Sequence, residues 1–106
     1  MAKTVVSAFH RQEAFHILDS VLASGFDSQR FSVINSTAAA EPLESVMYDV
    51  PSIEARLYRK HLLSGDSLLV ARVSDRDVAR LIKLLQSTGG QHIEAFDPVN
   101  RSAKEH

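Results

Sequence analysis

"VVSAFHRQEAFHILDSVLASG" (residues 5–25) and "LVARVSDRDVARLIKLLQSTG" (residues 69–89) align with each other without a gap, at a constant offset of 64 residues. In each segment the first apolar residues alternate with period two, as Val5 and Phe9 do, which is typical of a half-buried strand. The next apolar residues recur every three or four positions, which is typical of one helix face. A glycine follows each helical stretch, where a left-handed backbone is least costly for that residue. The chain therefore contains the same strand–helix plan twice.

A second short strand follows each repeat, "FSVI" (31–34) in the first half and "IEAF" (93–96) in the second. Each half is then strand–helix–strand, and two such halves predict an α+β fold, the ferredoxin-like βαβ-(α)-βαβ sandwich. Right-handed crossovers would place both repeat helices on one face of a four-stranded antiparallel sheet with strand order 4-1-3-2. Within this sheet the first and third strands are expected at the centre, parallel to each other.

The middle of the chain departs from the repeat. "NSTAAAEPLESVMYDV" (35–50) has no clear period and is expected to be a linker. "PSIEARLYRKHLLSG" (51–65) predicts an extra helix with Pro51 in its first turn and a narrow apolar stripe formed by Ile53, Leu57 and either His61 or Leu62. The polar segment 100–106 is expected to fray. The 106 residues are expected to form a single domain, 1–106, because this length suffices for one core.

The matched periods also predict the core between the sheet and the two repeat helices. One set of positions comes from the inward face of each strand and the other from the apolar stripe of each helix. The expected core residues are Val5, Phe9, Ile17, Leu18, Val21, Phe31, Val33, Leu69, Val73, Val78, Leu81, Leu85, Ile93 and Ala95.

The composition argues against several classes of function. The chain has no cysteine, which excludes disulfides, thiolate catalysis and cysteine-based zinc or iron–sulfur sites. Its net charge of −1 argues against a nucleic-acid-binding protein, which normally has a basic excess. No run approaches the roughly 18 apolar residues of a membrane span, and the first residues lack the apolar segment of a secretory signal. We therefore expect a cytoplasmic protein that binds no nucleic acid and does not insert into a membrane.

Two longer stretches are similar to one known family. "VVSAFHRQEAFHILDSVLASGFDSQRFSVI" (5–34) resembles the opening half of the general stress protein 17M-like family, also called the heat-induced stress protein YflT domain. "HLLSGDSLLVARVSDRDVARLIKLLQSTGGQHIEAF" (61–96) resembles its closing half. Many members carry a glycine-zipper segment in the middle, where this chain has "STAAAEPLESVMYD" (36–49). The resemblance implies a stress-associated, non-enzymatic protein, and we expect it to act by self-association or partner binding.

Few polar residues are candidates for a ligand site. His10 closes the first strand and His92 opens the fourth, and pairing of these strands would bring the two side chains close together; with Tyr48 they are the candidates for a ligand pocket. A metal site would need a third ligand such as Asp75 or Glu94. No histidine pair has a metal-binding spacing, so we expect two rim histidines and neither a metal nor a cofactor.

The candidate ligand residues leave one alternative function open, that of a small-ligand-binding module. It would be either an ACT-like regulatory domain or a dimeric α/β-barrel-type enzyme. Either would need a closed apolar cavity with inward polar groups, between subunits or on the open sheet face.

The sheet face away from the two repeat helices carries more apolar residues than a face left to water. Because large apolar patches mark contact sites, we predict a two-fold homodimer through this face, with arginine and glutamate pairing across the axis. The predicted interface residues are Val6, Ala8, Ile34, Leu68, Val70, Arg72, Glu94 and Phe96.

An alternative arrangement covers this face within one chain. The extra helix would then fold over the sheet through Ile53 and Leu57. Its basic residues Arg56, Arg59 and Lys60 are expected on its outer side, where an acidic partner could bind.

Overall fold

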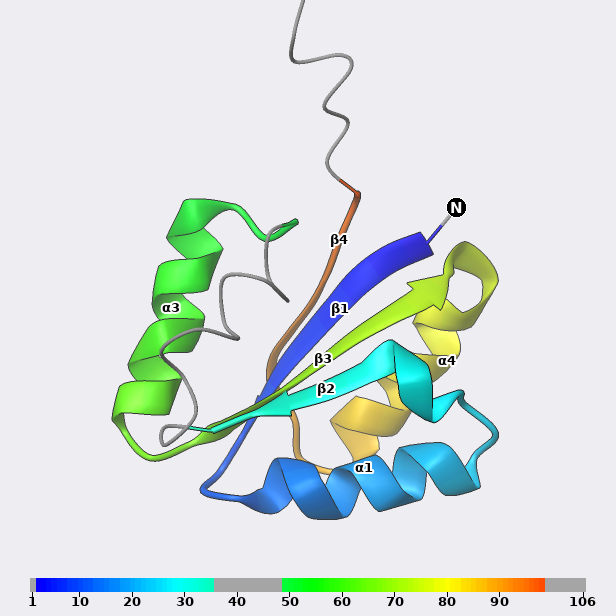
Figure 1. The fold of residues 1–106 in the computed structure, drawn as a ribbon, viewed down its shortest axis with the longest axis horizontal. Helices are drawn as coiled ribbons and strands as arrows, with labels where there is room; N and C mark the ends of the chain where they lie inside the picture. The colour runs from blue at the N-terminus through cyan, green and yellow to red at the C-terminus, as the bar shows by residue number, and fades with distance from the viewer. Residues whose placement is uncertain (1, 36–48, 99–106) are drawn as a thin grey trace, which may run out of the picture.

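The computed structural model describes residues 2–35 and 49–98, which form a four-stranded sheet with helices on both faces (Figure 1). The first half comprises β1 (Ala2–Phe9), α1 (Glu13–Ala23), a short 3₁₀ turn η1 (Ser28–Arg30) and β2 (Phe31–Ile34). The second half comprises α3 (Ser52–Leu63), β3 (Ser67–Ser74), α4 (Asp75–Ser87) and β4 (Gln91–Phe96). The predicted extra helix and the βαβ plan of each half are thus confirmed.

The strand order is β2-β3-β1-β4, which is the predicted order counted from the opposite edge. The expectation that the first and third strands run parallel is wrong, because β1 pairs with β3 antiparallel, with Val6 opposite Val70. β3 also pairs with β2 antiparallel. A right-handed crossover through α1 makes β1 and β2 run the same way. The strand that lies between them must then oppose both.

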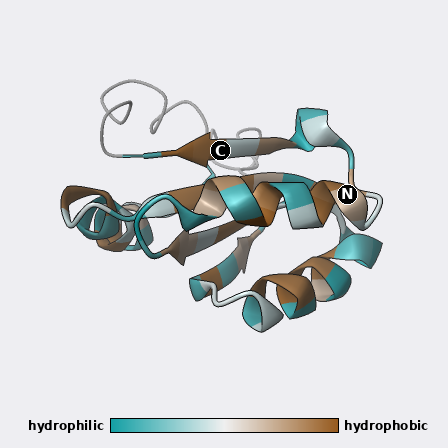
Figure 2. Ribbon diagram, turned by 90° about the horizontal axis from the view of Figure 1, so that it is seen from below, coloured by the Kyte–Doolittle hydropathy of each residue, from teal (hydrophilic) through white to brown (hydrophobic). Residues whose placement is uncertain are grey.

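The core between the sheet and the helices α1 and α4 follows the predicted register. It contains Val5, Phe9, Leu69 and Val73 from the strands and packs against the apolar stripes of α1 and α4. Figure 2 shows apolar and polar residues interleaved along α1, as expected for a helix with one buried face. All the predicted core residues lie in or against this cluster except Ala95, which is exposed on the edge strand β4.

A second core fills the opposite face of the sheet, and α3 covers it (Figure 1). Its buried residues include Tyr58 and Leu62 of α3, which are 1% and 2% exposed. The remaining buried residues of this cluster are Val6, Ala8, Ile34, Val50, Leu68 and Val70. Thus five of the predicted interface residues are buried inside one chain, and the exposed patch that suggested a homodimer through this face is absent from the described part of the chain.

The stripe of α3 that meets the sheet agrees with the predicted one at Leu62, one of the two alternatives, and differs from it at Ile53 and Leu57. Ile53 and Leu57 are 73% and 39% exposed, whereas Tyr58 and Leu62, with Ala55 half-buried beside them, face the sheet. Both stripes have helical spacing, so periodicity alone does not choose between them. Tyrosine brings the larger apolar surface, and its hydroxyl can be buried because backbone carbonyls accept its proton.

Candidate functional site

The last turn of α3 ends in a Schellman motif that brings His61 and Asp66 together. The Gly65 N–H donates to the Leu62 carbonyl (3.0 Å) and the Asp66 N–H donates to the His61 carbonyl (2.9 Å). Gly65 has the left-handed φ of 92° that glycine adopts at little steric cost. The same loop places His61 Nδ1 2.8 Å from Asp66 Oδ2, and both side chains are only 17% exposed. A local helix end therefore builds a mostly buried histidine–aspartate pair.

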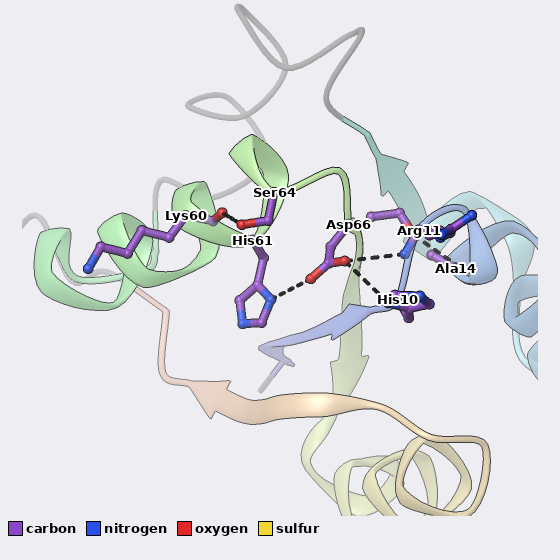
Figure 3. Close-up of polar contacts among 8 residues, drawn as sticks. His10, Arg11, Ala14, Lys60, His61, Ser64 and Asp66 are labelled. Atoms are coloured by element: carbon purple, nitrogen blue, oxygen red, sulfur yellow. Dashed lines mark hydrogen bonds and ion pairs between the residues drawn. The ribbon is translucent and has the colours of Figure 1, made fainter.

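Asp66 also ties this helix end to the turn between β1 and α1 (Figure 3). Its Oδ1 accepts a hydrogen bond from the Arg11 N–H at 3.2 Å and lies 3.9 Å from His10 Nδ1. Arg11 has a φ of 51°, a left-handed conformation that costs energy for a residue other than glycine. The carboxylate therefore holds an unfavourable turn in place and joins two segments far apart in the sequence.

The surroundings of Asp66 favour its ionised form. Its partial burial alone would raise the pKa of the carboxyl group. The hydrogen bonds from His61 and from the Arg11 N–H, together with the charges of His61 and His10, outweigh this effect and lower the pKa of Asp66 below its usual value.

His92 lies on an irregularity of β4 beside this cluster. The pairing of β1 with β4 shifts between Val6↔Glu94 and Ala8↔Gln91, so β4 has one extra residue there. His92 has a φ of 50°, as the left-handed residue of a β-bulge often does. Its carbonyl oxygen accepts a hydrogen bond from the hydroxyl of Tyr58, and the Val6 carbonyl lies 3.4 Å from the same hydroxyl.

Tyr58 remains a hydrogen-bond donor at this position. Burial, followed by the negative charges of Glu94 and Glu54, raises the pKa of Tyr58 well above its ordinary value. The hydroxyl therefore stays protonated at neutral pH, and α3 stays fastened to the bulge of β4.

A small open pocket lies where the end of α3 meets the bulge. The rings of His61 and His92 meet edge to face, with centroids 5.0 Å apart. The pocket has a volume of about 170 Å³ and is lined by Leu57, Lys60, His61, Ser64 and His92. Within residues 2–35 and 49–98, no three histidine or carboxylate side chains are placed to share a metal ion.

The predicted ligand residues are only partly brought together. His10 is 72% exposed on one side of Asp66, while His92 contacts His61, so the two predicted histidines are linked through His61 and Asp66. Tyr48 lies outside the described residues. Sequence reasoning named His61 only as a possible member of the apolar stripe of the extra helix and did not single out Asp66. The string "HLLSGD" (61–66) holds the missed signal, since a glycine C-cap places the residue that follows it beside the last turn of the helix.

A second polar cluster joins Asp49 to Thr4 of β1 and Arg72 of β3. Asp49 has a side chain only 2% exposed and lies 3.0 Å from Arg72 Nη2. The hydroxyl of Thr4 donates to the same carboxylate oxygen at 3.1 Å. Arg72, predicted to meet Glu94 across a two-fold axis, is thus paired within its own chain.

A larger pocket lies beside the first turn of α4. It has a volume of about 260 Å³ and includes Arg30, Arg80, Asp27 and Asp77 in its lining. Arg80 is already engaged there: its guanidinium stacks on Phe26 at 4.1 Å, lies 3.6 Å from Asp77 and donates to the Ser24 carbonyl. The lining also includes Arg72, which is paired with Asp49. With two of its three arginines engaged by carboxylates and with Asp27 and Asp77 in the lining, this pocket is poorly suited to an anion.

Comparison with known proteins adds no relative: no family model, no curated protein and no solved structure matches this chain. In the described part of the chain, no helix has the length and apolar character needed to cross a bilayer. Any function must therefore be argued from the residues and the geometry above.

The lowered pKa of Asp66 predicts a pH dependence of stability. A carboxyl group whose pKa is lowered by folding stabilises the protein above its ordinary pKa of about 3.9, and this contribution is lost as the pH falls through the lowered value. We expect the difference in urea midpoint between the wild type and Asp66→Asn to be largest near neutral pH and to shrink below about pH 4. Asp19→Asn, at an exposed position, is the control and should leave the pH profile unchanged. A difference that stays constant down to about pH 2 would contradict the role given to Asp66.

Proposed function

We propose that this chain is a small stress-associated binding protein without catalytic activity, and that it docks a partner on the outer face of α3. We define this outer face by its exposed residues Ile53, Arg56, Leu57, Arg59, Lys60 and Leu63. The partner is a protein segment that carries apolar side chains flanked by aspartate or glutamate. The stress association follows from the family resemblance, and the docking surface from the composition of this face.

One observation supports docking above the rest. Three large apolar side chains are exposed on the outer face of α3, with Ile53 at 73%, Leu57 at 39% and Leu63 at 82%. Single exposed apolar residues are common on protein surfaces. Here three exposed apolar side chains lie on one face of α3, and the opposite face already makes the sheet contacts through Tyr58 and Leu62. A helix of this kind typically contacts a second apolar surface.

The charges select the chemistry of the partner. Arg56, Arg59 and Lys60 lie among the three apolar side chains, while the chain as a whole has a net charge of −1. The basic character is therefore local to this helix, and it would attract an acidic surface of matching size. An anionic bilayer would be attracted by the same cations, so the experiment below includes vesicles as a separate outcome.

A labelled peptide probe tests the proposal. The probe is a helix-forming peptide of about 20 residues with leucines at i, i+4 and i+7 and glutamates between them; its counterpart carries lysines in place of glutamates. Fluorescence anisotropy should show saturable binding of the acidic peptide by the wild type. We expect Arg56→Glu/Arg59→Glu to weaken this binding by about tenfold or more, equivalent to about 1.4 kcal/mol.

The matched control reverses two exposed basic residues of α4. Arg76→Glu/Lys83→Glu changes the net charge equally but leaves α3 intact, and it should bind the acidic peptide as the wild type does. Equal loss in both variants, or equal binding of the acidic and basic peptides, would refute docking on α3. Binding to phosphatidylserine vesicles in place of the peptide would identify a membrane surface and would refute the protein partner.

The stress association has its own measurement. The abundance of the protein, measured by quantitative mass spectrometry in its source cells, should rise after a heat shift. Unchanged abundance would separate this chain from the stress proteins it resembles and would leave the docking experiment unaffected.

A further inference from the structure

We propose that the pocket between the last turn of α3 and the bulge of β4 binds a small oxyanion, a free carboxylate or phosphate group. Its lining, drawn from the described residues, combines one lysine with two histidines and contains no carboxylate. This site adjoins the partner surface proposed above and shares Leu57 and Lys60 with it.

His61 is oriented for this task by Asp66. The carboxylate 2.8 Å from Nδ1 fixes a proton on that nitrogen, which leaves Nε2 to face away from Asp66. Figure 3 shows the second ring nitrogen of His61 turned away from Asp66, on the side of β4. An anion in the pocket would favour uptake of a proton from solvent at Nε2, and the resulting imidazolium would then lie between two negative groups. This arrangement favours the charged ring on both sides.

The other lining residues complete an anion site. His92 is held beside His61 by the bulge, with the ring centroids 5.0 Å apart, and Lys60 provides a flexible ammonium at the rim. The C-terminal end of a helix normally repels anions. Here the Lys60, His61 and Leu62 carbonyls already accept hydrogen bonds from the backbone of residues 64–66, which reduces the repulsion.

The size of the pocket limits the ligand. Its volume of about 170 Å³ equals that of a few water molecules at about 30 Å³ each. Pockets for drug-sized ligands are larger, about 300–1,000 Å³. The ligand is therefore a group of the size of acetate or inorganic phosphate, either free or at the end of a longer molecule. The larger pocket beside α4 is a weaker candidate because Asp27 and Asp77 line it.

NMR of the histidine rings tests the proposal directly. Sodium phosphate and sodium acetate are titrated separately at about pH 6, where histidines are partly protonated, and sodium chloride keeps the ionic strength constant. The ring signals of His61 and His92 should shift together and saturate, and the arm that saturates at the lower concentration identifies the preferred oxyanion. His16, exposed on α1, is the internal reference and should not respond.

Two conservative variants make the result decisive. Lys60→Gln should weaken the phosphate or acetate titration by about threefold or more, in keeping with loss of one charge-assisted contact, and Lys83→Gln on α4 should not change it. Shifts of His61 and His92 that are linear in concentration and match those of His16 would overturn the proposal, as would identical titrations of the two variants. The peptide experiment above leaves Lys60 in place, so each proposal can fail without the other.

Discussion

Replacing Tyr58 by alanine is expected to lower the free energy of unfolding by about 3–5 kcal/mol, the range for truncation of a buried aromatic side chain. Tyr58 is 1% exposed and fills the second core between α3 and the sheet. The change also removes the hydroxyl that donates to the His92 carbonyl. Urea or guanidinium denaturation measures the loss.

Two comparisons separate the parts of this effect. Tyr58→Phe retains the ring and removes only the hydroxyl, so we expect a smaller loss of about 1–3 kcal/mol from an unsatisfied carbonyl. Leu62→Ala and Leu63→Ala form a matched pair, because Leu62 is 2% and Leu63 is 82% exposed. The first should cost about 2–5 kcal/mol and the second at most about 0.5 kcal/mol. Equal effects at these two positions would show that α3 does not cover the sheet through this face.

Replacing Phe9 by alanine is the second large change, with an expected loss of about 3–5 kcal/mol. Phe9 is 1% exposed in the core formed with α1 and α4. Phe15→Ala is the natural control, because that phenylalanine is 44% exposed on α1 and its removal should cost about 0.5 kcal/mol or less. If both substitutions shifted the denaturation midpoint by the same amount, the register assigned to β1 and α1 would be wrong.

The two large predictions concern opposite faces of one sheet, and together they test its layered design. Val5 and Val6 are adjacent in β1 and both buried, one against α1 and α4 and the other against α3. A strand buried on both faces loses the alternation of apolar and polar residues that a half-exposed strand shows. The continuous burial of residues 4–9 in β1 and 67–71 in β3 thus follows from α3 covering the sheet, and a second copy of the chain is not required to explain it.

The candidate site could be anticipated only in part. His10 and His92 stand at strand ends that the predicted order makes neighbours, so topology alone suggested that they lie near each other. The residue that organises the cluster is Asp66, and its contact with Arg11 joins a helix end to a distant turn. Periodicity has no information on such a contact, because the contact depends on how two loops meet at the end of the two central strands, β1 and β3. The positive φ of Arg11 and of His92 was equally hidden, since neither is a glycine.

The sequence by itself determined the repeated strand–helix plan, the core register and the helix ends. These properties depend on side-chain spacing along one element and on glycine after a helix, as Gly25, Gly65 and Gly89 with φ between 92° and 99° show. Only the tertiary structure decided which stripe of α3 is buried, whether a second chain is needed to cover the sheet, and which charges pair. The physical reason is that Ile53–Leu57 and Tyr58–Leu62 have the same helical spacing. The choice between them depends on the shape of the sheet face and on carbonyl acceptors from distant strands, which local sequence does not contain.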